Sequence, residues 1–83
     1  METIIVEITA AALEENADFL LPAHVPVSSL LPEIIRLVEQ VHIGVAIDSE
    51  HPMLFDMERG VLLSPDETLA QAGLHFGHPL LLL

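Results

Sequence analysis

Alternating apolar residues open this chain and predict a β-strand. Within residues 3–9, every second position is apolar and branched, at Ile4, Val6 and Ile8. Side chains at this spacing share one face of an extended segment, and branched side chains favour strands. The last four residues, Leu80–Leu83, are apolar without alternation, which is typical of a strand buried inside a sheet. Strands are therefore predicted at both ends of the chain.

A second strand is predicted at Phe19–Leu21, at an edge of the sheet. Pro22 and Pro26 follow it, and proline cannot donate a hydrogen bond to a neighbouring strand. Residues 10–18 are predicted to form a turn with some local helix. The segment Ala10–Glu15 has helix propensity, but it is too short to form a stable helix by itself.

The main helix is predicted over residues 28–41, where apolar residues recur at steps of three and four. Ser28 and Ser29 are candidate N-caps. Pro32 falls in the first turn, where its missing N–H costs little. The apolar stripe of this helix consists of Leu30, Leu31, Ile34, Ile35, Leu37, Val38 and Val41.

A β-hairpin is predicted after the helix, with strands over residues 53–57 and 61–63 and a turn between them. In its first strand Leu54 and Asp56 are expected to face outward, because they alternate with three apolar residues. The residues expected to face the core are Met53, Phe55 and Met57.

Two minor elements complete the prediction. They are a short extended piece at residues 45–47 and one helical turn over residues 69–73, closed by a glycine. The full order is strand, strand, helix, strand, strand, short helical turn, strand. This order resembles the ubiquitin-like β-grasp fold, an α+β architecture. The resemblance implies a mixed sheet of four to five strands on one main helix, with the first and last strands parallel at its centre.

Charge and composition restrict the classes of function. The 83 residues include 13 acidic residues and two arginines but no lysine, for a net charge of −11. The chain therefore lacks the basic surface that nucleic acid or anionic lipid would need. It has no cysteine, which excludes disulfides and thiolate sites. Because 52% of the residues are apolar, we expect one compact domain over residues 1–83 and not a disordered acidic tail.

Targeting signals are not recognisable in the sequence. It lacks the basic N-terminal region of a signal peptide, and its longest uninterrupted apolar run is four residues. A membrane-spanning helix needs about 20 apolar residues. We therefore expect a cytoplasmic protein, which could reach the inner face of the membrane through a partner. It could act alone or as a domain of a larger membrane component.

Two stretches carry a family resemblance. Residues 21–32 read Leu-Pro-Ala-His-Val-Pro-Val-Ser-Ser-Leu-Leu-Pro and resemble the corresponding run of actinobacterial EccD N-terminal domains. Residues 60–74 contain the pattern Gly-x-x-Leu-x-x-x-x-Thr-Leu-x-x-Ala-Gly and resemble the YukD/EsaB family. Proteins of that family are small ubiquitin-like components of type VII (ESX or WXG100) secretion systems. The resemblance covers nearly the whole chain.

The resemblance implies a non-enzymatic adaptor or docking component. Such a protein would use no cofactor and would bind protein partners, expected to be cytoplasmic parts of a secretion complex. The chain departs from the family at residues 77–79, Gly-His-Pro, where the family usually has Gly-Asp before the last strand. The turn predicted at residues 10–18 is also longer than the first hairpin of the family. A generic β-grasp interaction domain unrelated to secretion is the alternative hypothesis.

Candidate chemistry is sparse. Conjugation or sulfur transfer needs a thin C-terminal tail that ends in Gly-Gly, whereas this chain ends in four leucines. His75 and His78 are three residues apart, a spacing that metal sites can use. They lie in a predicted turn without a recognisable third ligand, so solvated loop histidines are the favoured interpretation. Asp66 and Glu67 form an acidic pair at a turn, where N-capping by Ser64 or Asp66 is the favoured interpretation over acid–base chemistry. No catalytic residue is predicted.

One face of the predicted sheet is a candidate interaction surface. Residues that alternate with core positions point outward, and an exposed apolar patch usually marks an interaction site. The residues predicted for this patch are Ile5, Leu54, Leu81 and Leu83. Ubiquitin-like domains commonly bind partners through this face. A homodimer formed through the same face is a second arrangement that fits the pattern.

Overall fold

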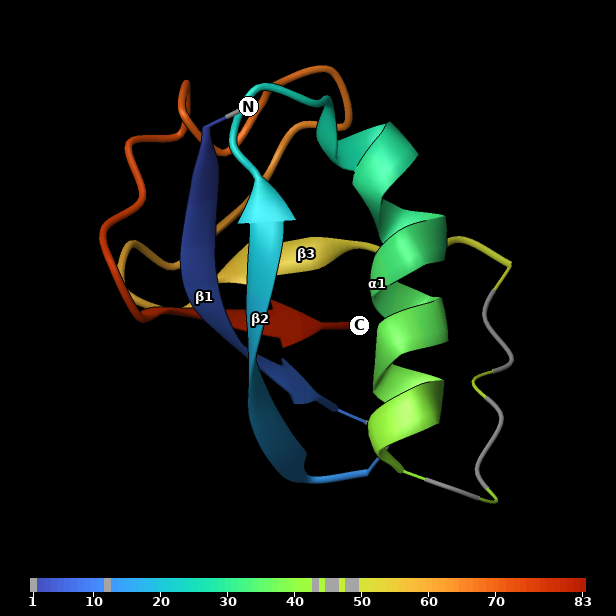
Figure 1. Cartoon of the computed structure of the whole chain (residues 1–83). Coiled ribbons are helices and arrows are strands. Elements are labelled where there is room, and N and C mark those ends of the chain that lie inside the picture. Colours follow the sequence, from blue (N-terminus) through green and yellow to red (C-terminus); the bar gives the residue numbers. More distant parts are fainter. Residues whose placement is uncertain (1, 12, 43, 45–46, 48–49) are drawn as a thin grey trace.

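The computed structural model describes residues 2–11, 13–42, 44, 47 and 50–83. Within these residues the chain forms one α-helix and five strands, and the strands make a single mixed sheet (Figure 1). The elements are β1 (Thr3–Ala10), β2 (Glu15–Pro22), α1 (Val27–Val41), β3 (Leu54–Asp56), β4 (Val61–Leu62) and β5 (His78–Leu82). Across the sheet the strands follow the order β2-β1-β5-β3-β4, and α1 covers one face.

The two ends of the chain meet at the centre of the sheet. β1 and β5 are parallel, with Val6 opposite His78 and Ala10 opposite Leu82. β2 pairs with β1 on one side and β3 pairs with β5 on the other, both antiparallel. The parallel central pair predicted from the sequence is therefore confirmed. β2 occupies an edge of the sheet, as its flanking prolines indicated.

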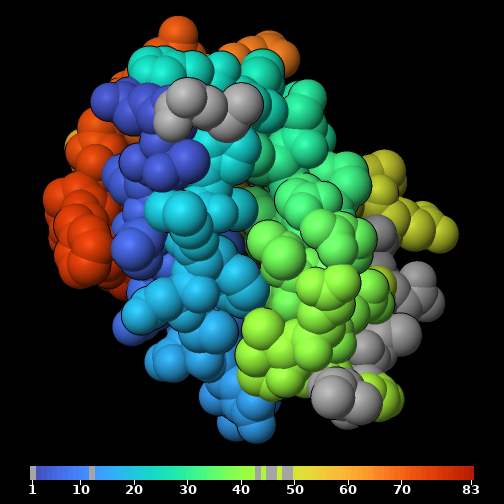
Figure 2. All heavy atoms as spheres, viewed as in Figure 1, coloured from blue at the N-terminus to red at the C-terminus, as the bar shows by residue number. Residues whose placement is uncertain are grey.

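An aliphatic core fills the space between the sheet and α1. The helix contributes Leu30, Ile34 and Val38, which are at most 2% exposed, and β1 contributes the fully buried Val6. Burying each such side chain contributes roughly 1.5–3 kcal/mol. Figure 2 shows α1 and β2 side by side on the surface that encloses this core. The predicted apolar stripe is confirmed except at its end, where Val41 is 53% exposed.

α1 begins one residue earlier than predicted and does not use a serine cap. Pro26 occupies the N-cap position. The N–H of Val27 donates to the carbonyl oxygen of Glu67 at 2.9 Å, and that of Ser28 to Pro65 at 3.0 Å. The segment that follows β4 therefore satisfies the first amides of the helix. This long-range contact makes a side-chain cap unnecessary, and the predicted serine caps are wrong.

The first hairpin is tighter than predicted. β2 begins at Glu15 and pairs with β1 along its full length, so residues 15–18 are strand. Glu14 adopts a left-handed φ of 55° and donates its N–H to Ala10 at 3.0 Å, which closes the turn. Pairing with β1 outweighs the local helix propensity of the alanine run. The long first turn expected at residues 10–18 is therefore wrong.

β3 faces the opposite way from the prediction. Leu54 and Asp56 are fully buried, whereas Met53 and Met57 are 44% and 48% exposed. The prediction placed Asp56 outward because it alternates with three apolar residues that were expected to face the core. Here His78 and two backbone N–H groups hydrogen-bond that carboxylate, so it is buried with its partners. Leu54 therefore belongs to the core and not to the outer face.

The shorter elements agree with the prediction in part. β4 ends at Leu62, one residue earlier than expected, and β5 starts at His78, two residues earlier. Residues 69–73 form hydrogen-bonded turns and not a helix. The extended piece predicted at residues 45–47 lies largely outside the described residues. In the part of the chain that the structure describes, no helix has the length and hydropathy to cross a membrane.

Candidate functional site

A row of side chains crosses the outer face of the sheet, on the side away from α1. The register places the following residues side by side, one each from β1, β5, β3 and β4: Thr9, Leu81, Phe55 and Leu62. Paired residues put their side chains on the same face of a sheet. Leu54, one position before Phe55, is buried against the helix side, so this row points outward.

Two pairs of residues, one on each side of this row, extend the apolar surface. Met53 and Leu83 lie opposite one another, since the N–H of Leu83 donates to the carbonyl oxygen of Met53 at 2.9 Å, and both are 44% exposed. Met57 donates its N–H to Pro79 at 3.2 Å and is also half-exposed. We call the following residues the outer apolar patch: Met53, Phe55, Met57, Leu62, Leu81 and Leu83.

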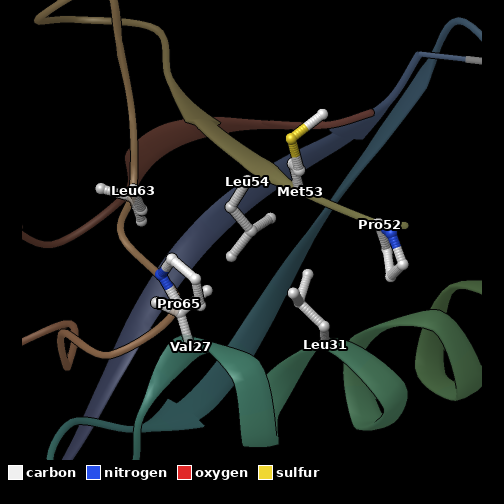
Figure 3. Close-up of a pocket in the computed structure, with 7 residues that line it drawn as sticks. All are labelled: Val27, Leu31, Pro52, Met53, Leu54, Leu63 and Pro65. Carbon is white, nitrogen blue, oxygen red and sulfur yellow. The ribbon is translucent and has the colours of Figure 1, made fainter.

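Figure 3 shows the two faces of β3 next to the helix. The Leu54 side chain points toward Val27 and Leu31 of α1, whereas Met53 points to the other side of the sheet. The pocket drawn there has a cavity volume of about 40 Å³. Sites for small organic ligands measure about 300–1,000 Å³. This pocket is therefore too small to hold a substrate or an organic cofactor.

The residues predicted for the interaction surface fall in different places. Leu81 and Leu83 lie in the outer apolar patch, and Ile5 lies on the same face but closer to the β2 edge. Leu54 was predicted wrongly, because it is fully buried in the core. Whether the three outward residues bind a partner stays a prediction. The outer apolar patch also contains four residues that the sequence pattern did not assign to it: Met53, Phe55, Met57 and Leu62.

A buried carboxylate lies at the end of β3, on the core side of the sheet. Asp56 Oδ1 accepts hydrogen bonds from the N–H groups of Glu58 at 3.0 Å and Arg59 at 3.1 Å, and from His78 Nε2 at 2.8 Å. Burial alone would raise the pKa of Asp56, but these hydrogen bonds outweigh it and lower the pKa. The Arg59 guanidinium lies 3.7 Å from Oδ2. Asp56 therefore fixes both the β3–β4 turn and the His78 ring.

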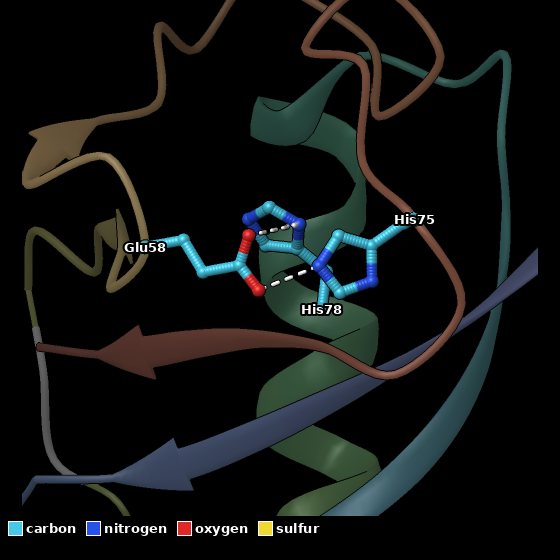
Figure 4. Close-up of side chains that lie close together, drawn as sticks. All are labelled: Glu58, His75 and His78. Atoms are coloured by element: carbon cyan, nitrogen blue, oxygen red, sulfur yellow. Dashed lines mark hydrogen bonds and ion pairs between the residues drawn. The ribbon is translucent and has the colours of Figure 1, made fainter.

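Two histidines and one glutamate gather beside this carboxylate (Figure 4). His75 Nε2 is 2.5 Å from one carboxylate oxygen of Glu58, and His78 Nδ1 is 3.8 Å from the other. The contact of His75 Nδ1 with the Phe76 carbonyl oxygen, together with Glu58, raises the pKa of His75. His78 is buried, whereas His75 and Glu58 are about half-exposed. These three residues have the side chains that could hold a metal ion.

Comparison with known families decides where the chain belongs. A family model described as the WXG100 protein secretion system (Wss), protein YukD, matches residues 4–82. The chain belongs to the YukD family. The family membership inferred from the two sequence stretches is therefore confirmed. No curated protein sequence matches this YukD-family chain.

Several solved structures with the same fold come from type VII secretion systems. The EccD5 ubiquitin-like domain from Mycobacterium xenopi is 25% identical with a TM-score of 0.84, and the match covers 100% of this chain and 94% of that one. The ubiquitin-like domain of Mycobacterium tuberculosis ECCD1 is 24% identical with a TM-score of 0.78, over 100% and 99% of the two chains. A chain of the MycP5-free ESX-5 inner membrane complex is 17% identical with a TM-score of 0.82, over 100% and 21%.

These similarities confirm the fold class of this YukD-family chain as a ubiquitin-like β-grasp. The described residues form the expected helix on a five-stranded mixed sheet, at the upper end of the predicted strand number. In the ESX-5 structure the same fold forms only part of a larger chain. The fold therefore occurs both as a separate domain and within a membrane complex.

Proposed function

We propose that this YukD-family chain is a non-enzymatic docking component of a type VII secretion machine. In this proposal the outer apolar patch binds a protein partner on the cytoplasmic side of the membrane. The observation that carries the proposal is the run of outward apolar side chains on and next to three neighbouring strands, β5, β3 and β4. Four of them are about half-exposed, Met53, Met57, Leu62 and Leu83, and the central Phe55 and Leu81 are partly exposed. A contiguous exposed patch of this kind usually marks a protein interface.

The family and the charge of the chain narrow the class of partner. A similar fold occurs in a chain of the ESX-5 inner membrane complex, which favours a component of such a complex. Acidic side chains lie on the same face, where Glu7 of β1 is paired with Asp18 of β2. With a net charge of −11 on the chain, the complementary surface is apolar at its centre and basic at its rim.

Two features of the described residues favour a binding role over catalysis. The pocket between α1 and β3 has a cavity volume of about 40 Å³. This is little more than the roughly 30 Å³ that one water molecule occupies in the liquid. Asp56 and His78, the acid–base pair of the core, are at most 2% exposed in their side chains, so a substrate would not reach them. Both observations favour a surface that recognises another protein.

Co-purification from the native host tests the proposal. Leu62 and Met53 are replaced singly by Asp, because both are about half-exposed and tolerate a polar residue without loss of core packing. Val41→Asp is the matched control, since Val41 is equally exposed but lies on α1. We expect wild type and V41D to recover components of the secretion machine, identified by mass spectrometry, and L62D and M53D to lose them.

Two results would contradict the docking proposal. Equal recovery of secretion components by wild type, L62D and M53D would show that the outer apolar patch is not the interface. A wild-type dimer in light scattering that L62D converts to a monomer, without any loss of secretion components, would assign the patch to self-association instead. Circular dichroism of each variant establishes that the fold is retained.

A further inference from the structure

Three titratable side chains from separate parts of the chain meet at one end of the sheet. Glu58 lies in the turn between β3 and β4, His75 lies in the segment before β5, and His78 is the first residue of β5. Their ligand atoms lie within 4.8 Å of one another. Figure 4 shows both imidazole rings turned toward the Glu58 carboxylate. None of these three residues belongs to the outer apolar patch, so the cluster is a site distinct from the proposed docking surface.

The buried ring of His78 presents a lone pair to the cluster. A carboxylate oxygen only accepts hydrogen bonds, so His78 Nε2 must carry a hydrogen and donate it to Asp56 Oδ1 at 2.8 Å. His78 Nδ1 is buried and has no hydrogen-bond partner among the described residues. Its nearest charged atom is Glu58 Oε1, at 3.8 Å. When the ring is neutral, His78 Nδ1 can only accept a hydrogen bond, and the carboxylate oxygen that it faces, Glu58 Oε1, is also an acceptor.

His75 is half-exposed, and one of its ring nitrogens also donates a hydrogen bond while the other faces the Glu58 carboxylate. Its Nδ1 lies 2.8 Å from the carbonyl oxygen of Phe76, so Nδ1 carries a hydrogen and donates it. Its Nε2 faces Glu58 Oε2 at 2.5 Å. A proton on Nε2 would account for this one contact, but it would leave His78 Nδ1 without a partner. A cation placed between the two rings and the carboxylate satisfies all three groups at once.

We propose that Glu58, His75 and His78 bind a divalent transition-metal ion, with Zn²⁺ as the best match. In metal-binding histidines the N–H of the second ring nitrogen typically donates a hydrogen bond to a carboxylate or a backbone carbonyl, as in His78 and His75 here. Two imidazole nitrogens and one carboxylate oxygen are a common zinc ligand set, which leaves a fourth position for water. Asp56 is a positioning residue, because it acts on the ion only through the His78 ring.

The distances fit this ion after small side-chain rotations. With bond lengths near 2.1 Å, ligand atoms of a tetrahedral zinc site are separated by about 3.4 Å. Glu58 Oε2 lies 2.5 Å from His75 Nε2, and Glu58 Oε1 lies 3.8 Å from His78 Nδ1. One ligand atom from each of the three residues lies within 4.8 Å of the other two, so rotation of the carboxylate can present a single oxygen to both rings. His75 and Glu58 are half-exposed and can adjust, whereas Asp56 and the core hold His78 in place. Arg59 carries the nearest positive charge, and it lies against the far oxygen of Asp56.

Zinc titration of the untagged full chain tests this site by calorimetry. We expect one Zn²⁺ ion per chain and a higher midpoint of thermal unfolding, because the ion would bind only the folded chain. His75→Gln and Glu58→Gln each remove one ligand from a half-exposed position, so these variants should fold. We expect each to lose more than the roughly 10–100-fold in affinity that removal of an outer partner costs. His24→Gln is the matched control, since His24 also contacts a glutamate on the surface.

A spectroscopic readout separates a positioning role of Asp56 from a merely structural one. Co²⁺ in place of Zn²⁺ gives visible absorption bands that report the ligand geometry. We expect Asp56→Asn to bind Co²⁺ about 10–100-fold more weakly, with altered bands, whereas H75Q and E58Q should lose the bands. Three results would overturn the proposal: wild type that binds no Zn²⁺, folded H75Q and E58Q that bind it as wild type does, or an equal loss in H24Q.

Discussion

The buried Asp56 carboxylate gives the sharpest test of how this fold is held together. Replacing it with alanine removes the acceptor of three hydrogen bonds, two from the turn that follows β3 and one from the His78 ring. The turn residues Glu58 and Arg59 are exposed, so water can replace the carboxylate at their N–H groups. The His78 side chain is only 2% exposed, so its Nε2–H would lose its partner without gaining water.

The size of the effect follows from this difference in exposure. A buried donor left without an acceptor costs about 1–3 kcal/mol, and the loss is larger when the missing acceptor was a charged carboxylate. We therefore expect Asp56→Ala to lower the free energy of unfolding by about 3 kcal/mol. Asp56→Asn keeps an acceptor oxygen for His78 and should cost about 1–2 kcal/mol. Against a total stability of about 5–15 kcal/mol for small domains, both losses are large.

Urea unfolding followed by circular dichroism measures both changes, with EDTA present so that no metal contributes. Asp66→Ala is the control, because Asp66 is exposed in a turn and its replacement should change the free energy by less than about 0.5 kcal/mol. In the double variant D56A/H78A the unpaired donor is gone, so the combined loss should be smaller than the sum of the single losses. A loss below about 1 kcal/mol in D56A would refute the reasoning, because it would mean that water reaches the buried ring.

Three further predictions use other parts of the molecule. Ile34→Ala removes a fully buried helix side chain and should cost about 2–5 kcal/mol in urea unfolding. Gly60→Ala should cost about 1–2 kcal/mol, because Gly60 has a φ of +71° while the space around an added Cβ is open; Gly60→Asn should cost less. The hydrogen bond from Arg36 lowers the pKa of Glu33, so the stabilisation is present above the ordinary glutamate pKa and is lost as the pH falls through the lowered one. Arg36→Gln should return the Glu33 pKa toward its ordinary value in an NMR titration.

Local sequence patterns were sufficient to predict the main helix and the two central strands of this fold. The three- and four-residue spacing over residues 28–41 predicts the helix to within one residue at its start. The alternation over residues 3–9 and the unbroken leucines at the end predict the two central strands, whereas their parallel pairing was implied by the resemblance to the β-grasp order. These features depend on short-range periodicity and on burial from both sides, which a sequence displays directly.

Features that depend on long-range partners could not be predicted in this way. The helix start is satisfied by carbonyl groups of Pro65 and Glu67, nearly forty positions along the chain. The strand character of residues 15–18 comes from pairing with β1, against the local helix propensity. The metal-ligand spacing of His75 and His78 was visible, but the third ligand, Glu58, comes from a different turn. Only the folded sheet brings these groups together.

The orientation of β3 links the proposed docking surface to the proposed metal site. Because successive side chains of a strand point to opposite faces, burial of Asp56 forces Phe55 and the two flanking methionines outward. The hydrogen bond from His78 stabilises the buried Asp56 together with those from the N–H groups of Glu58 and Arg59, and it turns the other ring nitrogen toward Glu58. His78 thus supports both features. Loss of the His78 side chain should therefore disturb the outer apolar patch as well as the ligand cluster.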